Sequence, residues 1–180
     1  SHRGIFVINE LPDLQPRIQV ALFNILQEGD VQVRGFKLRL PLDIQFVFTA
    51  NPEDYTNRGA IITPLKDRIQ AQILTHYPPT IEQGMRITEQ EARIPAAQRE
   101  RVRVPDLLRV LIERVAMEAR DSDLVDRKSG VSARLTISAL ETLRASAEHR
   151  ALRAGAASTV ARMGDLWSIV PAITGKIELV

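Results

Sequence analysis

The sequence predicts an α/β region over residues 1–79, with an incomplete parallel sheet and an inserted β-hairpin, followed by an all-α region, a small helical domain over residues 80–180. Three observations carry this prediction. Two short, continuous apolar runs are typical of strands in a parallel sheet that is covered on both faces. An alternating apolar and polar segment around a glycine indicates a hairpin. Beyond Pro79 the patterns have helical spacing, and strands mixed with helices followed by helices alone favour two such parts.

The first region is predicted to contain a helix between its two main strands. Apolar residues recur at helical spacing from Ile18 to Leu26, and prolines precede them, where the first turn of a helix tolerates them. Gly29 follows as a stop signal. The predicted elements are, in order, a strand at 5–8, this helix, a hairpin at 31–40, a strand at 44–49, a short helix at 64–68 and a strand near 72–75.

The second region is predicted to consist of helices. Four segments have apolar residues at helical spacing, and Pro95, Ser129-Gly130 and Pro171 punctuate them. The predicted helices cover residues 81–93, 105–120, 132–151 and 156–167. This order of elements favours a small helical bundle beside the incomplete sheet.

Composition and charge limit the classes of protein to which the chain can belong. Hydrophobic residues make up 44% and charged residues 26% of 180 residues, a balance typical of globular proteins. The net charge is only +2, with acids and bases mixed, which differs from the footprint of a dedicated nucleic-acid binder. The absence of cysteine excludes disulfides, thiol catalysis and zinc–thiolate sites, and we expect a cytoplasmic protein. No apolar run reaches the ~18 residues of a membrane helix.

The chain opens inside a predicted strand. Ser1-His2-Arg3-Gly4 leads directly into the apolar run of residues 5–8, without an initiator methionine or a leader. Because a natural protein seldom begins within a buried strand, we expect the sequence to be a fragment of a longer protein.

Two polar side chains follow the main predicted strands. Glu10 comes after the first strand, and Asn51, in Ala50-Asn51-Pro52, comes after the second. Open α/β sheets bind ligands at the carboxyl ends of their strands. A glutamate there can deprotonate a water for attack on a terminal phosphate, and an amide can hold that water or a phosphate oxygen. Each residue also has a simple structural interpretation, because polar residues and Asn-Pro are common ways to leave a strand.

Two arginines are further candidates for phosphate contacts. Arg68 ends the segment Leu65-Lys66-Asp67-Arg68, and a guanidinium group recognises phosphate through a fixed fork of donors. Supplied by a neighbouring subunit, such an arginine can stabilise transition-state charge. Arg134 lies at the predicted start of a long helix, where Ser132 is expected to cap the helix.

The order of these features resembles the AAA+ ATPases, and it is most similar to the branch that contains the magnesium-chelatase ATPase subunit and the MoxR proteins. Four ordered stretches carry the resemblance: GIFVINE at 4–10, LFNILQEG at 22–29, FTANP at 48–52 and PLKDR at 64–68. The resemblance implies that residues 1–79 form the C-terminal part of a P-loop NTPase core sheet. Residues 80–180 would then form the helical lid domain.

The resemblance implies a role for each candidate residue. Glu10 would be the Walker B glutamate that activates water, and Asn51 the sensor-1 residue. Arg68 would be the arginine finger, which reaches the nucleotide of the adjacent subunit in a homo-oligomeric ring. Arg134 would be the sensor-2 arginine of the lid. ATP and Mg²⁺ are the cofactors that the resemblance implies.

The predicted hairpin at 31–40 resembles an insertion that projects toward the pore of the ring in similar proteins. Arg34, Gly35 and Lys37 are therefore expected to face the pore or a partner. The partners implied are a protein client or a chelatase subunit with a von Willebrand-type domain.

Two departures from the family pattern concern metal and phosphate binding. Asn9 occupies the position of the usual Walker B acid, and its amide oxygen can hold a magnesium-bound water but brings no negative charge to the ion. The motif Gly-x-x-x-x-Gly-Lys-Ser/Thr, which cradles the β- and γ-phosphates, occurs nowhere in the sequence. The full-length protein is therefore expected to be the ATPase, and this piece alone is expected to be inactive.

Two alternative functions stay open beside a ring ATPase that remodels a partner or drives metal insertion. Arg34, Lys37 and Arg39 cluster around Gly35, and a nucleic-acid motor could grip DNA with such a hairpin; a steep salt dependence of binding would indicate it. Asn9 is also consistent with a regulatory scaffold that has lost catalysis. In that case, restoring aspartate at this position should not produce hydrolysis.

Overall fold

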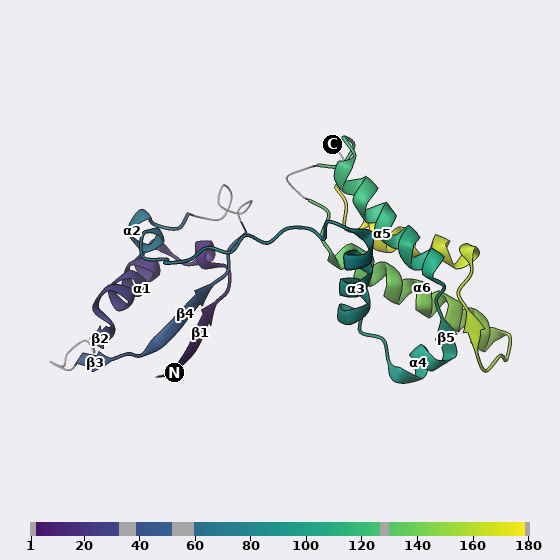
Figure 1. The fold of residues 1–180 in the computed structure, drawn as a ribbon, viewed down its shortest axis with the longest axis horizontal. Coiled ribbons are helices and arrows are strands. Elements are labelled where there is room, and N and C mark those ends of the chain that lie inside the picture. Colours follow the sequence, from purple (N-terminus) through teal and green to yellow (C-terminus); the bar gives the residue numbers. More distant parts are fainter. Residues whose placement is uncertain (1–2, 33–38, 52–59, 127–129, 179–180) are drawn as a thin grey trace. The chain divides into compact units, whose positions relative to one another are not determined.

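The computed structural model describes residues 3–32, 39–51, 60–126 and 130–178 and divides into two compact units, Ser1–Leu74 and Thr75–Val180 (Figure 1). The first unit mixes strands with helices, and the second is largely helical. Among the described residues, no helix has both the length and the apolar character needed to cross a membrane.

The first unit is built around two parallel strands. β1 (Gly4–Ile8) and β4 (Ile44–Phe48) pair in register, with Gly4 opposite Ile44, and this pairing extends to the ends of both strands. The two predicted main strands and their parallel direction are confirmed. The other elements of the unit are η1 (Leu11–Asp13), α1 (Pro16–Glu28), β2 (Asp30–Gln32), β3 (Arg39–Pro41) and α2 (Thr63–Lys66).

Helix α1 begins and ends where the local sequence signals indicate. Pro16 occupies its first position, where the missing N–H removes no helical hydrogen bond. At the other end Gly29 has a φ of 65°, and its N–H donates to the carbonyl of Ile25 at 2.9 Å. The left-handed conformation there is one that glycine adopts without strain. The predicted helix is confirmed.

Strands β2 and β3 pair antiparallel at the position of the predicted hairpin, with Val31 opposite Leu40. The residues that the sequence places at the tip of this hairpin, Arg34, Gly35 and Lys37, lie outside the described residues. Their role therefore stays a prediction.

The main strands are more exposed than the sequence predicts. Ile5 is 68% and Val7 54% exposed, and Val47 on the neighbouring strand is 42% exposed. Parallel sheets are normally covered on both faces, whereas β1 and β4 pair with no other strand within the described part of the chain. The apolar run correctly predicts a strand, but its burial depends on what packs against it.

The strand predicted near residues 72–75 is not formed. Within the described part of the chain this segment has no strand partner, and Ile73 and Leu74 are 90% and 74% exposed. The prediction is wrong because an apolar segment becomes a strand only where a neighbour takes up its backbone hydrogen bonds.

The second unit is organised around helix α6. Its elements are α3 (Ile81–Glu91), α4 (Ala96–Arg101), β5 (Val102–Arg103), α5 (Asp106–Asp121), α6 (Arg134–Arg153), β6 (Thr159–Val160), η3 (Met163–Ile169) and α7 (Val170–Thr174). Helices α3, α5, α7 and η3 all pack against α6, which runs through the middle of the unit (Figure 1). Leu140 and Leu143 of α6 are 2% and 0% exposed and share a core cluster with Leu108 and Ile112 of α5. Three predicted helices are confirmed as α3, α5 and α6.

The segment after α6 differs from the predicted helix at 156–167. Helix α6 ends at Arg153, Gly155 has a φ of 67°, and β6 then pairs in parallel with β5, where Val102 lies opposite Thr159. The sequence predicts neither these strands nor α4. A two-residue strand leaves no periodic pattern to detect, because its formation depends on its partner.

A buried carboxylate holds this segment against α6. Asp165 is 7% exposed and accepts hydrogen bonds from Arg150 of α6 at 2.8 and 3.1 Å, and from the Arg162 N–H at 2.8 Å. The same guanidinium group donates to the Thr159 hydroxyl and the Val160 carbonyl. The hydrogen bond from Arg150 lowers the pKa of the Asp165 carboxyl below its usual value. Arg150 therefore holds residues 159–165 in the conformation that is formed in place of the predicted helix.

We expect Asp165→Asn to destabilise the chain in a pH-dependent way. Because the folded-state pKa of Asp165 lies below its ordinary value of 3.8, the ionised carboxylate stabilises the fold above that pH. This contribution is lost as pH falls through the folded-state pKa. The urea midpoint of the variant should therefore lie below that of the unchanged chain at about pH 7, and the gap should close near pH 2.

The matched control is Asp106→Asn, because the Asp106 side chain is 88% exposed and lies 3.9 Å from its partner Arg109. Exposed ion pairs contribute little to stability, and an acidic residue in the first turn of a helix adds only about 0.3–1 kcal/mol, so this variant should lower the urea midpoint much less than Asp165→Asn does. Equal midpoints for Asp165→Asn and the unchanged chain at about pH 7, or a gap that persists in acid, would contradict the role given to Asp165.

Candidate functional site

Polar groups from β1 and β4 meet at the carboxyl ends of these strands. The Thr49 hydroxyl accepts a hydrogen bond from the Glu10 N–H at 3.1 Å and donates to Asn9 Oδ1 at 3.3 Å. Backbone bonds join the same corner, from the Thr49 N–H to the Ile8 carbonyl at 3.0 Å and from the Leu11 N–H to the Thr49 carbonyl at 2.9 Å. The parallel register makes the residues that follow each strand neighbours, so Asn9, Glu10 and Thr49 come together.

The backbone of Glu10 is strained. Its φ of 53° and ψ of 55° lie in the left-handed region, which costs a residue with a Cβ about 1–2 kcal/mol. Hydrogen bonds on both sides, to the Thr49 hydroxyl and carbonyl, hold this conformation, and the side chain is exposed. Residues held in strained conformations cluster at functional sites. Among Asn9, Glu10 and Thr49, Glu10 is therefore the strongest candidate for a functional residue.

Asn51 follows the same strand. It is exposed and lies two residues beyond Thr49, immediately before residues 52–59, which lie outside the described part of the chain. The chain therefore leaves β4 at the edge that carries Glu10, and the sensor role of Asn51 stays a prediction.

Arg68 follows helix α2 and stacks on helix α1. Its guanidinium carbon lies 5.7 Å from the centroid of the Phe23 ring, within cation–π range. Leu65, one turn earlier, is fully buried, while the Arg68 side chain is exposed. The cationic group is thus held on the surface of the unit.

A buried glutamine positions the start of α2. Gln19 of α1 is 1% exposed, and its Nε2 donates to the carbonyls of Leu14 at 2.9 Å and Ala60 at 3.2 Å. Its Oε1 accepts the Ile62 N–H at 2.9 Å. Gln19 therefore ties the segment before α2 to α1, and through it fixes the place of Arg68.

Arg134 belongs to the second unit, where it is the first residue of α6. It is exposed, its N–H donates to the Ser132 hydroxyl at 3.2 Å, and its carbonyl accepts Lys176 Nζ at 3.3 Å. Ser132 thus contacts the first residue of the helix, but the predicted serine cap is wrong, because Ala133 is the N-cap residue and no side chain caps the helix there. The nucleotide contact of Arg134 stays a prediction.

The oxygen donors at the sheet edge suit a hard cation. Asn9 Oδ1 and the Glu10 carboxylate are ligand types that Mg²⁺ takes, commonly one or two from the protein together with waters and substrate phosphates. Within the described residues, no three His, Cys, Asp or Glu side chains gather into a metal site. Asn9 and Glu10 are therefore the residues that would hold a magnesium ion, and its other ligands would have to come from phosphate and water.

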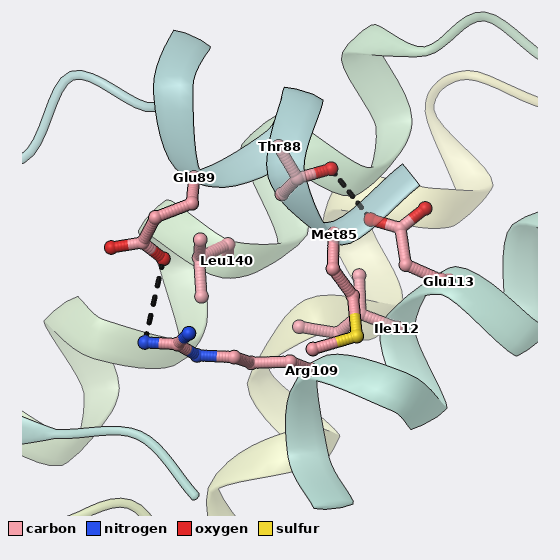
Figure 2. Close-up of a pocket in the computed structure, with 7 residues that line it drawn as sticks. All are labelled: Met85, Thr88, Glu89, Arg109, Ile112, Glu113 and Leu140. Carbon is pink, nitrogen blue, oxygen red and sulfur yellow. Dashed lines mark hydrogen bonds and ion pairs between the residues drawn. The ribbon is translucent and has the colours of Figure 1, made fainter. Parts of the chain in front are cut away.

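The second unit encloses a small cavity of about 10 Å³ between α3, α5 and α6 (Figure 2). Thr88 and Glu113 hydrogen bond on its wall, with 2.6 Å between their oxygen atoms, and Glu89 pairs with Arg109 at 3.6 Å. Glu89 also pairs with Arg144 at 3.6 Å. Burial lowers the pKa of the Arg144 guanidinium group below its ordinary value, and the negative charge of Glu89 opposes this shift in part. The volume is that of about one water molecule, so this cavity is too small for a nucleotide.

Two residues of the site have no functional assignment from the sequence alone. Thr49 lies inside the stretch FTANP, but its role depends on the β1–β4 register, which a single sequence does not display. For Gln19 the sequence contains a weak signal. It is a polar residue on the same helical face as the apolar Leu22 and Leu26. A polar residue on such a face indicates a buried hydrogen-bonding role.

Comparisons with known proteins give distant structural similarity only. No protein-family model matches the sequence, and no curated protein matches it. A solved structure of a candidate ATPase from Cytophaga hutchinsonii is 16% identical, with a TM-score of 0.40, over 98% of this chain and 59% of that one. NtrX from Brucella abortus, solved in complex with ADP, is 18% identical, with a TM-score of 0.46, over 92% of this chain and 35% of that one. The chain therefore spans between about a third and three fifths of the two proteins, and TM-scores this low assign no activity to it.

Proposed function

We propose that the chain is the C-terminal part of the core and the helical lid of a ring-forming AAA+ ATPase, similar to the magnesium-chelatase and MoxR branch. The observation that supports this most is the meeting of Asn9, Glu10 and Thr49 at the carboxyl ends of two parallel strands. Ligands of open α/β sheets bind at this edge. The strained backbone of Glu10 adds to the case.

Glu10 is the proposed general base. The substrate is ATP with its Mg²⁺, and the bond that is broken is the phosphoanhydride bond between the terminal phosphate and ADP, which leaves. Glu10 accepts a proton from a water molecule while the water oxygen attacks the terminal phosphorus, and it later returns the proton to phosphate or solvent. Asn51 orients this water. The carboxylate of Glu10 is exposed, and hydrogen bonds from the Glu10 and Leu11 N–H groups to Thr49 hold its backbone, which supports this role.

Arg68 and Arg134 are the proposed phosphate contacts from outside this corner. Arg68 is exposed and its guanidinium group lies over Phe23, which supports its proposed role at a nucleotide bound by a neighbouring copy of the protein. An arginine supplied in this way stabilises transition-state charge. Arg134 contacts the nucleotide from the lid. A site shared between subunits makes activity depend on assembly of the ring.

Further strands are proposed to complete the sheet in the full-length protein. Ile5, Phe6 and Val7 of β1 are all more than 40% exposed, which is unusual for a parallel sheet. We infer that one of the added strands leads into the phosphate-binding loop that this sequence lacks. The chain by itself is therefore not expected to turn over ATP.

The finer assignment to the magnesium-chelatase and MoxR branch rests on the resemblance of the four sequence stretches. The ring is then expected to remodel a protein client or a chelatase partner subunit through the insertion that contains Arg34, Gly35 and Lys37. A cytoplasmic location is expected for such a machine.

The test is ATP turnover by the full-length protein as a function of its concentration. Turnover per subunit should rise with concentration, because Arg68 acts on the nucleotide of a neighbour. Thr49→Val should lower the turnover about fivefold, since it removes the hydroxyl between Glu10 and Asn9, and Thr49→Ser should retain it.

Two outcomes would redirect the proposal. Full-length protein that binds no nucleotide would overturn it. Protein that binds ATP without hydrolysing it, and stays inactive after Asn9→Asp, would favour a regulatory scaffold. The observation behind that second function is Asn9 itself, an uncharged side chain whose oxygen already accepts a hydrogen bond from Thr49.

A further inference from the structure

A chain of buried polar side chains joins α3, α5 and α6 at the start of α6. Thr88 Oγ1 lies 2.6 Å from Glu113 Oε1 and 2.7 Å from Thr136 Oγ1, and Thr136 Oγ1 lies 3.1 Å from the Ala133 carbonyl oxygen. Figure 2 shows Thr88 and Glu113 facing each other. All three side chains belong to residues that are at most 5% exposed. Their contacts must therefore be met within the protein.

The two hydroxyl groups cannot supply all three hydrogen bonds, because each carries one hydrogen. An ionised Glu113 can only accept, so Thr88 would donate to it and Thr136 would donate to Thr88. The Ala133 carbonyl would then lose its bond from Thr136. A protonated Glu113 donates to Thr88, Thr88 donates to Thr136, and Thr136 donates to Ala133. The neutral acid is thus the form that provides a hydrogen for every contact.

The surroundings of Glu113 agree with a neutral acid. Burial raises the pKa of its carboxyl above the ordinary value of 4.5, and the hydrogen bond with Thr88, the positive charge of Arg120 and the nearby Thr136 hydroxyl oppose this without reversing it. The other titratable groups on the cavity wall are Glu89 and Arg109, which pair with each other.

Helix α3 lies close to this acid because residue 84 is glycine. A Cβ at Gly84 would lie 2.5 Å from Glu113 Oε2. The glycine thus leaves room for the carboxyl group to lie between α3 and α5, within reach of Thr88.

Arg120 fixes the segment before α6 from another side. Its Nε donates to the Val131 carbonyl at 3.2 Å, and its guanidinium carbon lies 4.2 Å from the centroid of the Tyr77 ring. Val131 and Ala133 flank Ser132, whose hydroxyl accepts the Arg134 N–H. The turn that presents Arg134 is therefore held by two separate sets of contacts.

We propose that Glu113 heads a one-directional relay of hydrogen bonds through Thr88 and Thr136 and thereby acts as a positioning residue for Arg134. The relay stands on the geometry alone, while its consequence for ATP rests on the proposed function. Glu113 is buried, so no contact between it and the nucleotide is part of the proposal. It acts by keeping the first turn of α6 in one place.

The relay is tested first by Glu113→Gln in the full-length protein, because the amide N–H can donate to Thr88 as the neutral acid does. A pKa raised above 4.5 means that the stability contribution of Glu113 is complete below that pH and is lost as pH rises through the folded-state value. The urea midpoint of the variant, read by pulsed hydrogen–deuterium exchange in peptides of α6, should therefore rise relative to that of the unchanged protein as pH increases from about 4.5 through the folded-state pKa. A variant midpoint that lies below the unchanged one by the same amount throughout this range would overturn the relay.

The positioning role is tested by ATP kinetics of the same protein. Thr88→Val interrupts the relay, and it should raise the KM for ATP about tenfold with little change in kcat, because Arg134 is expected to bind phosphate in the ground state as well as in the transition state. A loss of folded protein would instead lower the apparent kcat and leave KM unchanged. The control is Thr142→Val on α6, whose hydroxyl donates only to the Ser138 carbonyl at 2.7 Å.

The outcomes separate the two proposals. If the full-length protein hydrolyses ATP and Thr88→Val has the same KM as Thr142→Val, the positioning role is wrong and the proposed function stands. If the protein hydrolyses no ATP, the proposed function fails, and the pH dependence of Glu113→Gln still decides whether the relay exists.

Discussion

Glu10→Gln in the full-length protein is expected to lower ATP turnover by about 100-fold or more, which is the lower range for loss of a general base. The amide has the shape of the carboxylate, and the backbone bond from the Glu10 N–H to Thr49 does not involve the side chain. The change therefore removes proton transfer while the corner keeps its geometry. ATP binding should change little, because the proposed base acts on water rather than on the nucleotide.

The measurement is steady-state turnover together with nucleotide binding by the same preparations. Glu28→Gln is the matched control, since Glu28 is an exposed glutamate at the end of α1. It should retain normal turnover. If Glu10→Gln binds ATP normally and hydrolyses it at a rate similar to that of the control, Glu10 is not the base.

Leu143→Ala is expected to lower the free energy of unfolding of the second unit by about 2–5 kcal/mol. Leu143 is 0% exposed and lies in the α6 core cluster with Leu108 and Ile112. Removing its side chain loses buried apolar contacts and leaves a cavity that the surrounding helices fill only in part.

Leu152→Ala provides a control on the same helix, because Leu152 is 55% exposed. Both variants replace a leucine of α6 by alanine, so the difference between them reports chiefly the effect of burial. Urea unfolding followed by circular dichroism should shift clearly for Leu143→Ala and by less than about 0.5 kcal/mol for Leu152→Ala. Equal shifts would show that Leu143 is not part of a packed core.

The elements that the sequence predicts well are those specified by neighbouring residues. Helix α1 follows from helical spacing, Pro16 and Gly29, all within one short segment. Glu10 is a candidate because it comes just after an apolar run, and β1 does end before it. These signals act over a few residues, so one sequence contains them in full.

The elements that it predicts poorly depend on distant partners. The helix expected at 156–167 is replaced by β6 and η3, because Arg150 pairs with Asp165 and β6 pairs with β5. The strand expected near 72–75 has no partner within the described residues. Apolar spacing alone cannot show whether such a partner exists.

The sequence by itself determined the two parallel strands and helix α1 of the first unit, helices α3, α5 and α6 of the second, and the position of Glu10 after the first strand. Only the tertiary structure decided that Thr49 joins Glu10 to Asn9, and that Glu113 meets Thr88 and Thr136 between three helices. The physical reason is range. Helix spacing and turn residues act between neighbours along the chain, whereas a hydrogen bond between Glu113 and Thr88 requires folding to bring together residues that are 25 positions apart.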